Sequence, residues 1–124
     1  MSAKTCKEAH EGFMKAFKGG EDSEILDFVS SDVKIYYKGE PKERGAMDFL
    51  MILHHQSKRI GADIKVLETK FLDRKNLIQE ESVQVKTNDG LSDKDVTTTY
   101  SYSDRDGPWL MQKVDTDYDW IFFG

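Results

Sequence analysis

Residues 94–120, KDVTTTYSYSDRDGPWLMQKVDTDYDW, contain two long strand-forming segments on either side of a turn. Lys94 to Ser103 and Trp109 to Trp120 are rich in β-branched and aromatic side chains, which favour strands. The turn from Asp104 to Pro108 combines aspartate, glycine and proline, the residue types that reverse a chain most easily. A short turn between two long strands predicts an antiparallel pair.

Two further segments of the same kind precede this pair. Ile64 to Leu72 and Leu77 to Lys86 are predicted strands, and turn clusters at 73–76 and 88–90 follow them. No stretch with the helical spacing of apolar residues lies between these segments, so a parallel arrangement with crossover helices is disfavoured. The C-terminal half is therefore predicted to be an antiparallel meander.

The N-terminal residues predict a helix. Thr5 and Glu8 have the spacing of a capping box, Thr-x-x-Glu. Gly19 and Gly20 end the helix, because glycine adopts the left-handed geometry of a helix C-terminus at little cost. The apolar residues between these signals recur on one helical face: Ala9, Phe13, Ala16 and Phe17.

A second helix, a strand and a third helix follow. Asp22 or Ser23 is expected to cap the second helix, which is predicted to be short and to end at 30–32. Val33 to Lys38 alternates between apolar and polar residues as a half-buried strand does, and Gly39 to Pro41 ends it. The third helix is predicted to run from Gly45 to about Arg59 and is apolar on more than one side. The buried side of the second helix is predicted to consist of Ile25, Phe28 and Val29.

The predicted order of elements is therefore ααβαββββ. Helices grouped at the start and strands at the end indicate an α+β fold, in which three N-terminal helices pack in a strongly curved, mainly antiparallel sheet. The chain of 124 residues is long enough for one domain with its own core and too short for two, so residues 1–124 are predicted to form a single domain.

Charge and cysteine content exclude several classes of protein. Acidic residues outnumber basic ones by 23 to 18, a formal net charge of −5, which argues against binding to nucleic acid. Cys6 is the only cysteine, so no internal disulfide is possible, and a reducing compartment such as the cytoplasm is expected. No apolar run is long enough to cross a bilayer, and no secretory signal is recognisable, so no membrane association is predicted.

Several local patterns resemble the nuclear transport factor 2-like superfamily, which includes the SnoaL-like and ketosteroid-isomerase-like proteins. Residues 13–22 resemble its first helix and the turn after it, and residues 28–35 resemble its second helix and first strand. Residues 39–45 resemble the entry to its third helix, and residues 107–114 resemble its last hairpin. The resemblance covers about Thr5 to Phe122 and consists of fold signatures, none of which is a catalytic motif.

The resemblance implies a cone with a pocket between sheet and helices, and dimerisation through the outer face of the sheet. Members of the superfamily include ketosteroid isomerases, polyketide cyclases, dehydratases, epoxide hydrolases, transport adaptors and kinase association domains. The fold alone does not choose among these activities. No cofactor is predicted.

The resemblance also indicates which residues correspond to the catalytic positions of the isomerases. Those enzymes use a tyrosine on the first helix, a carboxylate base at the end of the first strand and an acid on a later strand. The corresponding residues here are Phe13, Tyr37 and about Tyr100, none of which is a suitable base at neutral pH. Steroid isomerisation is therefore disfavoured. Phe13, Tyr37, Leu50 and Tyr100 are expected to line a ligand pocket; alternatively, the two tyrosines are half-buried strand aromatics.

Glu81 and His54 are the candidate acid–base residues. Glu81 shares the alternation of Leu77, Val83 and Val85, which puts a carboxylate in an apolar row. Inside a cone, desolvation would raise its pKa; alternatively, the row faces solvent or a bulge changes the alternation. His54 follows the apolar run of the third helix and is either at the pocket mouth or on the surface.

The histidines and the acidic residues are not expected to bind a metal. His54 and His55 are adjacent and so point about 100° apart on a helix, which is no metal-ligand spacing. The alternating carboxylates Asp115, Asp117 and Asp119 predict an acidic strip, and no metal site is predicted. His10 is expected to be exposed, and Cys6 is expected to be a plain helix-start residue.

The last strand predicts a homodimer. Leu110, Val114, Tyr118 and Trp120 are apolar on one alternation, and Trp109 and Met111 are apolar on the other. If the helices cover one face, a second chain is needed for the opposite face. The apolar tail, residues 120–124, is expected to pack as well.

Three functions are compatible with these observations. The first is a homodimeric domain of unassigned activity that binds an apolar or amphipathic small molecule in its pocket. The second is a lyase, isomerase or cyclase that uses Glu81 or His54 with tyrosine hydroxyls. The third is a protein-interaction or transport-adaptor module.

Overall fold

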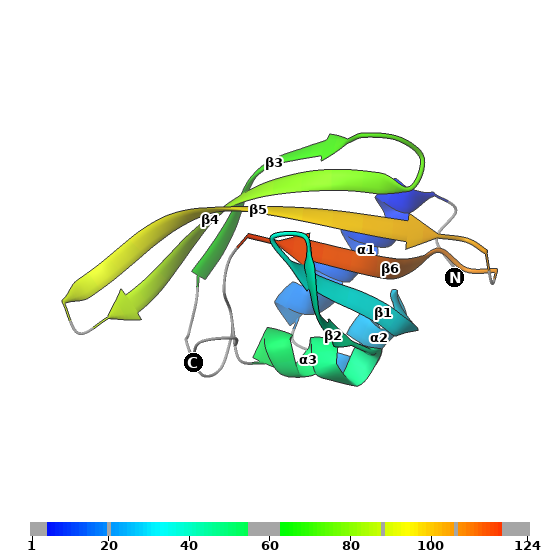
Figure 1. Cartoon of the computed structure of the whole chain (residues 1–124), viewed down its shortest axis with the longest axis horizontal. Coiled ribbons are helices and arrows are strands. Elements are labelled where there is room, and N and C mark those ends of the chain that lie inside the picture. The colour runs from blue at the N-terminus through cyan, green and yellow to red at the C-terminus, as the bar shows by residue number, and fades with distance from the viewer. Residues whose placement is uncertain (1–4, 20, 55–62, 88, 106, 118–124) are drawn as a thin grey trace.

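A curved sheet of six strands forms the body of the molecule, with the strands in the order β2-β1-β6-β5-β4-β3 (Figure 1). The computed structural model describes residues 5–19, 21–54, 63–87, 89–105 and 107–117. Neighbouring strands are antiparallel, except that β1 and β6 are parallel. The strands are β1 (Val29–Tyr37), β2 (Glu40–Arg44), β3 (Asp63–Phe71), β4 (Asn76–Thr87), β5 (Gly90–Ser103) and β6 (Leu110–Thr116).

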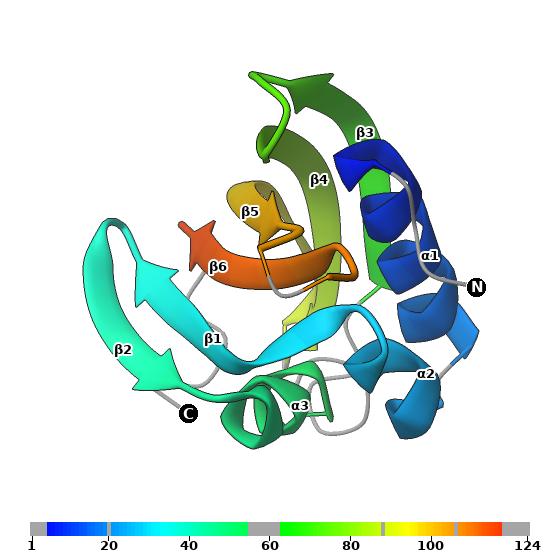
Figure 2. The same cartoon turned by 90° about the vertical axis from the view of Figure 1, so that its right-hand side faces the viewer.

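Three helices cover one face of this sheet, as Figure 2 shows. They are α1 (Cys6–Gly19), α2 (Asp22–Leu26) and α3 (Ala46–His54). The backbone N–H of Glu8 donates to Thr5 Oγ1 over 3.1 Å, which confirms the predicted helix cap. None of the described helices is long and apolar enough to cross a membrane.

The predicted α+β fold class is confirmed, with one strand added. β2 was not predicted, because Gly39 to Pro41 was expected only to end the preceding strand. Lys38 and Gly39 have positive φ angles of 50° and 83°, the geometry of a two-residue hairpin turn, and Tyr37 pairs with Glu40 across it. Pro41 is tolerated because β2 is an edge strand.

The start of β1 is a second correction. Val29 was predicted on the buried side of the second helix, but it begins β1 and pairs with Met111 of β6. α2 is one turn shorter than expected and ends at Leu26. The third helix was predicted to reach Arg59, and its part beyond His54 lies outside the described residues.

A bulge in β6 corrects the interpretation of its apolar residues. The pairing with β5 shifts from Tyr102↔Met111 to Ser101↔Lys113, so Gln112 is an extra residue. Met111 and Val114 are therefore both buried on the helix-covered side, with exposures of 0% and 5%, although their alternation predicts opposite faces. The apolar residues of β6 therefore do not by themselves require a second chain to cover the outer face of the sheet. The predicted contribution of Tyr118, Trp120 and the tail lies outside the described residues.

Candidate functional site

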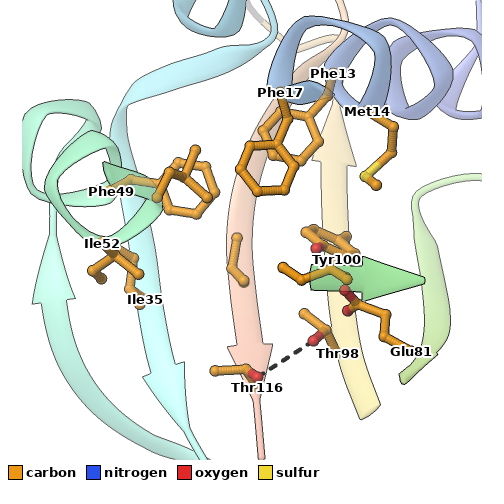
Figure 3. A pocket seen from close by; sticks show the side chains of 13 residues that line it. Phe13, Met14, Phe17, Ile35, Phe49, Ile52, Glu81, Thr98, Tyr100 and Thr116 are labelled. Carbon is orange, nitrogen blue, oxygen red and sulfur yellow. Dashed lines mark hydrogen bonds between the residues drawn. The ribbon is translucent and has the colours of Figure 1, made fainter. Parts of the chain in front are cut away.

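A small cavity of about 40 Å³ lies between the helices and the sheet (Figure 3). It is enclosed by apolar side chains from α1 and α3 on one side and by strand residues on the other. The polar groups in its wall all come from β4, β5 and β6. Its lining consists of Phe13, Met14, Phe17, Ile35, Phe49, Ile52, Leu53, Ile64, Glu81, Thr98, Tyr100, Val114 and Thr116.

Glu81 places a carboxyl group in this largely apolar cavity. Leu77, Glu81 and Val83 all face inward along β4, and Glu81 is only 6% exposed. Burial raises the pKa of Glu81 from 4.5 to about 7, because the charged form loses its hydration. Side-chain hydrogen bonds from Thr98 and Gln79 act in the opposite direction, and the nearby charge of Asp117 adds a small increase. Near neutral pH the carboxyl group can therefore both accept and donate a proton.

Tyr100 brings a hydroxyl group to the same cavity. Tyr100 is 8% exposed, and its ring centroid lies 6.1 Å from that of Phe13 and 4.8 Å from that of His10. Burial raises the pKa of Tyr100 well above 10, and the charge of Glu81 raises it further, so the hydroxyl stays protonated. Within the described part of the chain this hydroxyl has no hydrogen-bond partner. A buried polar group without a partner is unusual and marks a place where a ligand atom or water can bind.

A chain of polar side chains crosses the core beside the cavity. Nε2 of His10 lies 2.6 Å from Oε1 of Gln79 and donates to it, and the hydroxyl of Tyr102 donates to Nδ1 of His10 over 2.8 Å. Gln79 also lies close enough to Glu81 to lower the pKa of that carboxyl group. At the far end, the hydroxyl groups of Thr98 and Thr116 are hydrogen-bonded over 3.3 Å, as Figure 3 shows. These bonds fix the positions of His10, Gln79 and Thr98 beside Glu81.

His10 corrects a prediction, since it was expected to be exposed and is 4% exposed. It faces the sheet because residues 6, 9, 10, 13 and 16 form the buried side of α1. Desolvation lowers the pKa of His10, opposed by its bond to Gln79 and by Glu11, so the ring is neutral at pH 7. The residues next to His10 in the sequence are polar, and this led to the prediction of an exposed side chain. The parity of Gln79 with Glu81 on β4 was the signal that could have identified Gln79.

Three residues predicted for the pocket lie elsewhere. Tyr37 is the last residue of β1, beside the turn to β2, and Ile35 is the β1 residue that lines the cavity. Leu50 is buried in the core but does not line the cavity, to which α3 contributes Phe49, Ile52 and Leu53. His54 is half-exposed, and its Nε2 lies 2.9 Å from Oδ1 of Asp22. His55 lies outside the described residues.

The remaining candidates have structural partners. The N–H of Gly39 donates to Oδ1 of Asp115 over 3.2 Å, and that of Thr97 donates to Oδ1 of Asp117 over 2.9 Å. Asp119 lies outside the described residues, among which no group of three or more potential metal ligands occurs. Burial raises the pKa of Cys6 to about 11, so its thiol is not activated.

A second, larger hollow opens on the other side of Met14. This groove lies between α1 and β3 and has a volume of about 690 Å³. Met14 belongs to the lining of both hollows, and Nε2 of Gln79 donates a weak hydrogen bond to Met14 Sδ over 3.8 Å. The thioether is therefore part of the wall between the cavity and the groove. The groove is lined by Lys7, His10, Glu11, Met14, Lys15, Lys18, Val66, Thr69, Phe71 and Gln79.

Comparison with solved structures identifies similar folds. An epoxide hydrolase from Mycobacterium tuberculosis of the LEH-like type has a TM-score of 0.70 and 16% identity, over 96% of this chain and 83% of that one. A putative polyketide cyclase from Sinorhizobium meliloti has a TM-score of 0.69 and 13% identity, over 87% and 92%. Rv0760c from M. tuberculosis, solved with estradiol-17β-hemisuccinate, has a TM-score of 0.68 and 12% identity, over 94% and 95%.

Comparison of the sequence with protein-family models and with curated proteins gives no match. At identities this low, the likeness to solved structures concerns the fold. The chain has the cone-shaped α+β fold of nuclear transport factor 2-like proteins, and the predicted resemblance is confirmed at that level.

Proposed function

We propose that this chain binds a small apolar or amphipathic molecule inside the cone, with Glu81 and Tyr100 contacting a polar atom of that molecule. The observation that carries the proposal is the pairing of a carboxyl group of pKa about 7 with a buried hydroxyl that has no partner among the described residues. Apolar walls with a few placed polar groups are typical of small-molecule sites. Rv0760c, which has the same fold, was solved with an amphipathic steroid ester, which supports the proposal.

The cavity has to widen before it can hold such a molecule. Its volume of about 40 Å³ accommodates a water molecule, whereas drug-sized ligands occupy pockets of about 300–1,000 Å³. Met14 is the wall residue best suited to move, because it is only partly buried and methionine has three rotatable bonds. Rotation of its side chain joins the cavity to the groove of about 690 Å³.

Acid–base catalysis is the second candidate function. A carboxyl group with a pKa near the working pH is suited to proton transfer, and Tyr100 can stabilise a developing negative charge on a substrate oxygen. A lyase, isomerase, cyclase or hydrolase reaction fits this pair. In such an enzyme Glu81→Gln abolishes turnover, whereas a pure binding protein keeps its affinity to within a few fold.

A protein-interaction module is the third candidate, and it is supported by two observations. The cone is nearly filled, and large apolar side chains are exposed on α3 and β3, including Met47, Met51 and Leu67. The predicted homodimer through the outer sheet face stays a proposal within this framework. On that face β5 presents Thr97 and Thr99, whose hydroxyls can form hydrogen bonds across an interface. Native mass spectrometry at micromolar concentration measures whether one or two chains are present.

The test of the first proposal uses cyclohexanone, a compact apolar carbonyl compound, as the probe. In an NMR titration the amide signals of Glu81 and Tyr100 are expected to shift with a millimolar dissociation constant. Tyr100→Phe removes one hydrogen bond and is expected to weaken binding about fivefold. Tyr36→Phe, the same change at a half-buried tyrosine outside the cavity, serves as the control and leaves the affinity unchanged. Equal affinities for the two variants, or no shift at either amide, contradict the proposal.

A further inference from the structure

The groove between α1 and β3 combines a positively charged rim with an apolar wall. We propose that it is a second binding site, for an amphipathic molecule with a carboxylate at one end and a hydrocarbon body. The groove is distinct from the cone cavity, and its chemistry is set by different residues, apart from the shared Met14. The inference therefore stands or falls independently of ligand binding at Glu81.

The rim has the opposite charge to the whole chain. Lys7, Lys15 and Lys18 line the groove from α1, with Glu11 as the acidic residue among them. The rim thus has an excess of positive charge in a molecule whose net charge is −5. Among the residues that the structure describes, none of the three ammonium groups takes part in a salt bridge or a side-chain hydrogen bond. An anionic group can thus bind here without displacing an existing partner.

The wall opposite the lysines is apolar although it is exposed. Val66 and Phe71 of β3 are 39% and 43% exposed, and both face the groove together with the Met14 thioether. A hydrocarbon body lying against these side chains removes apolar surface from water on both partners, which stabilises binding by about 25 cal/mol per Å². The volume of about 690 Å³ falls within the range of about 300–1,000 Å³ found for small-molecule pockets.

As far as the structure describes the chain, the floor of the groove has no free charged group that could bind the carboxylate, and this orients the ligand. His10 is neutral at pH 7 because its pKa is lowered by burial, and both of its ring nitrogens are already hydrogen-bonded. Gln79 is buried, and its side chain is bonded to His10 and to Met14. The carboxylate is therefore expected at the lysine rim, where it keeps contact with water, and the hydrocarbon body is expected against Val66 and Phe71.

A small molecule fits this groove better than a second copy of the chain. A two-fold contact places the same surface of each chain against the other. At this groove such a contact would bring the lysine rims of two chains together, and like charges at an interface repel. A carboxylate carries the complementary charge.

The test compares two probes that have the same hydrocarbon chain and opposite charges, decanoate and decyltrimethylammonium. Titration by calorimetry and NMR is expected to give at least tenfold tighter binding of decanoate, with amide shifts on α1 and β3. Affinity for decanoate is expected to fall severalfold between 0.05 and 0.5 M salt, because salt screens exposed charges. The triple variant Lys7→Glu, Lys15→Glu, Lys18→Glu is expected to lose decanoate binding at least tenfold, and Phe71→Ser severalfold.

The matched control is Lys34→Glu, Lys65→Glu, Lys70→Glu, which makes the same change in net charge at exposed lysines outside the groove. It is expected to keep decanoate affinity to within twofold. Equal binding of both probes, equal loss in both triple variants, or a dimer that Phe71→Ser converts to monomer overturns the proposal. Tyr100→Phe separates this site from the cone, since it weakens cyclohexanone binding and leaves decanoate binding unchanged.

Discussion

The cone cavity and the α1–β3 groove share the side chain of Met14, yet they differ in size and in chemistry. The cavity, about 40 Å³, contains a carboxyl group and a hydroxyl group, and burial raises the pKa of both. The groove, about 690 Å³, has exposed lysines and an apolar wall. The groups suited to chemistry therefore lie where there is little space, and the space lies where the charged groups are solvated.

This difference shows how the fold uses its sheet. The inward-facing residues of β4 place Glu81 among side chains that exclude water, so the pKa of Glu81 depends on how closely they pack around it. β3, at the edge of the same sheet, leaves Val66 and Phe71 partly exposed, so that packing there contributes little to stability. The two hollows should therefore respond differently to the same kinds of substitution.

The largest difference is expected for the removal of an aromatic ring. Phe13 is 1% exposed and lies 5.9 Å from Phe49 and 6.2 Å from Phe17, measured between ring centroids. Phe13→Ala is expected to lower the free energy of unfolding by about 3–5 kcal/mol, because a buried ring leaves a cavity behind. Phe71→Ala, in the groove, is expected to lower it by less than about 1 kcal/mol.

Urea unfolding followed by circular dichroism measures both values. Because Phe13→Ala also enlarges the cone cavity, it is expected to strengthen the response to cyclohexanone where the variant remains folded. A loss for Phe71→Ala as large as that for Phe13→Ala shows that β3 belongs to the core or is covered by a partner, which removes the contrast between the two hollows.

The next effect concerns the pH dependence of stability. A pKa raised from 4.5 in the unfolded chain to about 7 in the folded chain means that the folded chain binds more protons between these values. The contribution of Glu81 to stability is therefore fully present below pH 4.5, falls as the pH rises to about 7, and is constant above pH 7. The loss amounts to about 3 kcal/mol. The lowered pKa of His10 acts in the opposite direction, with stability lost as the pH falls below 6.5.

Glu81→Gln isolates the contribution of Glu81, because glutamine stays neutral at every pH. The variant is expected to match the wild type at pH 4.5 and to be more stable by up to about 3 kcal/mol at pH 8. Chemical denaturation at a series of pH values provides the difference, and Glu80→Gln, at the exposed neighbour, is the matched control. Parallel curves for Glu81→Gln and the wild type would mean that Glu81 ionises normally, and the acid–base candidate would then be lost.

Much of the fold could be predicted because its determinants are local. The capping residue Thr5 and the alternation of β4 and β5 depend on neighbours in the sequence, and the structure agrees with both. The strand β2 and the placement of Val29 could not be predicted, since β2 has five exposed residues without alternation and Val29 is ordered by pairing with Met111. Long-range pairing leaves no local signal.

The cavity could be predicted only in part, for a similar reason. Alternation puts Glu81 and Tyr100 on inward rows, and the structure brings both to one cavity with Phe13. Alternation predicts Met111 and Val114 on opposite faces, but a bulge at Gln112 puts them on the same face. No residue type near Gln112 indicates a bulge in the sequence. His10 is buried because a buried partner, Gln79, satisfies its ring, and that pairing spans 69 positions of sequence.

The smallest effect is expected at the residue that the two hollows share. Met14 is partly buried, so Met14→Ala is expected to lower the free energy of unfolding by only about 1 kcal/mol. Its truncation opens the wall between cavity and groove, so decanoate, which in the wild type is expected to shift only groove amides, should then also shift those of Glu81 and Tyr100. Met14→Leu keeps the volume of the side chain and serves as the control, with decanoate shifts confined to the groove. Interior shifts that are the same in Met14→Ala and Met14→Leu would place the passage elsewhere and leave Met14 as part of an ordinary wall.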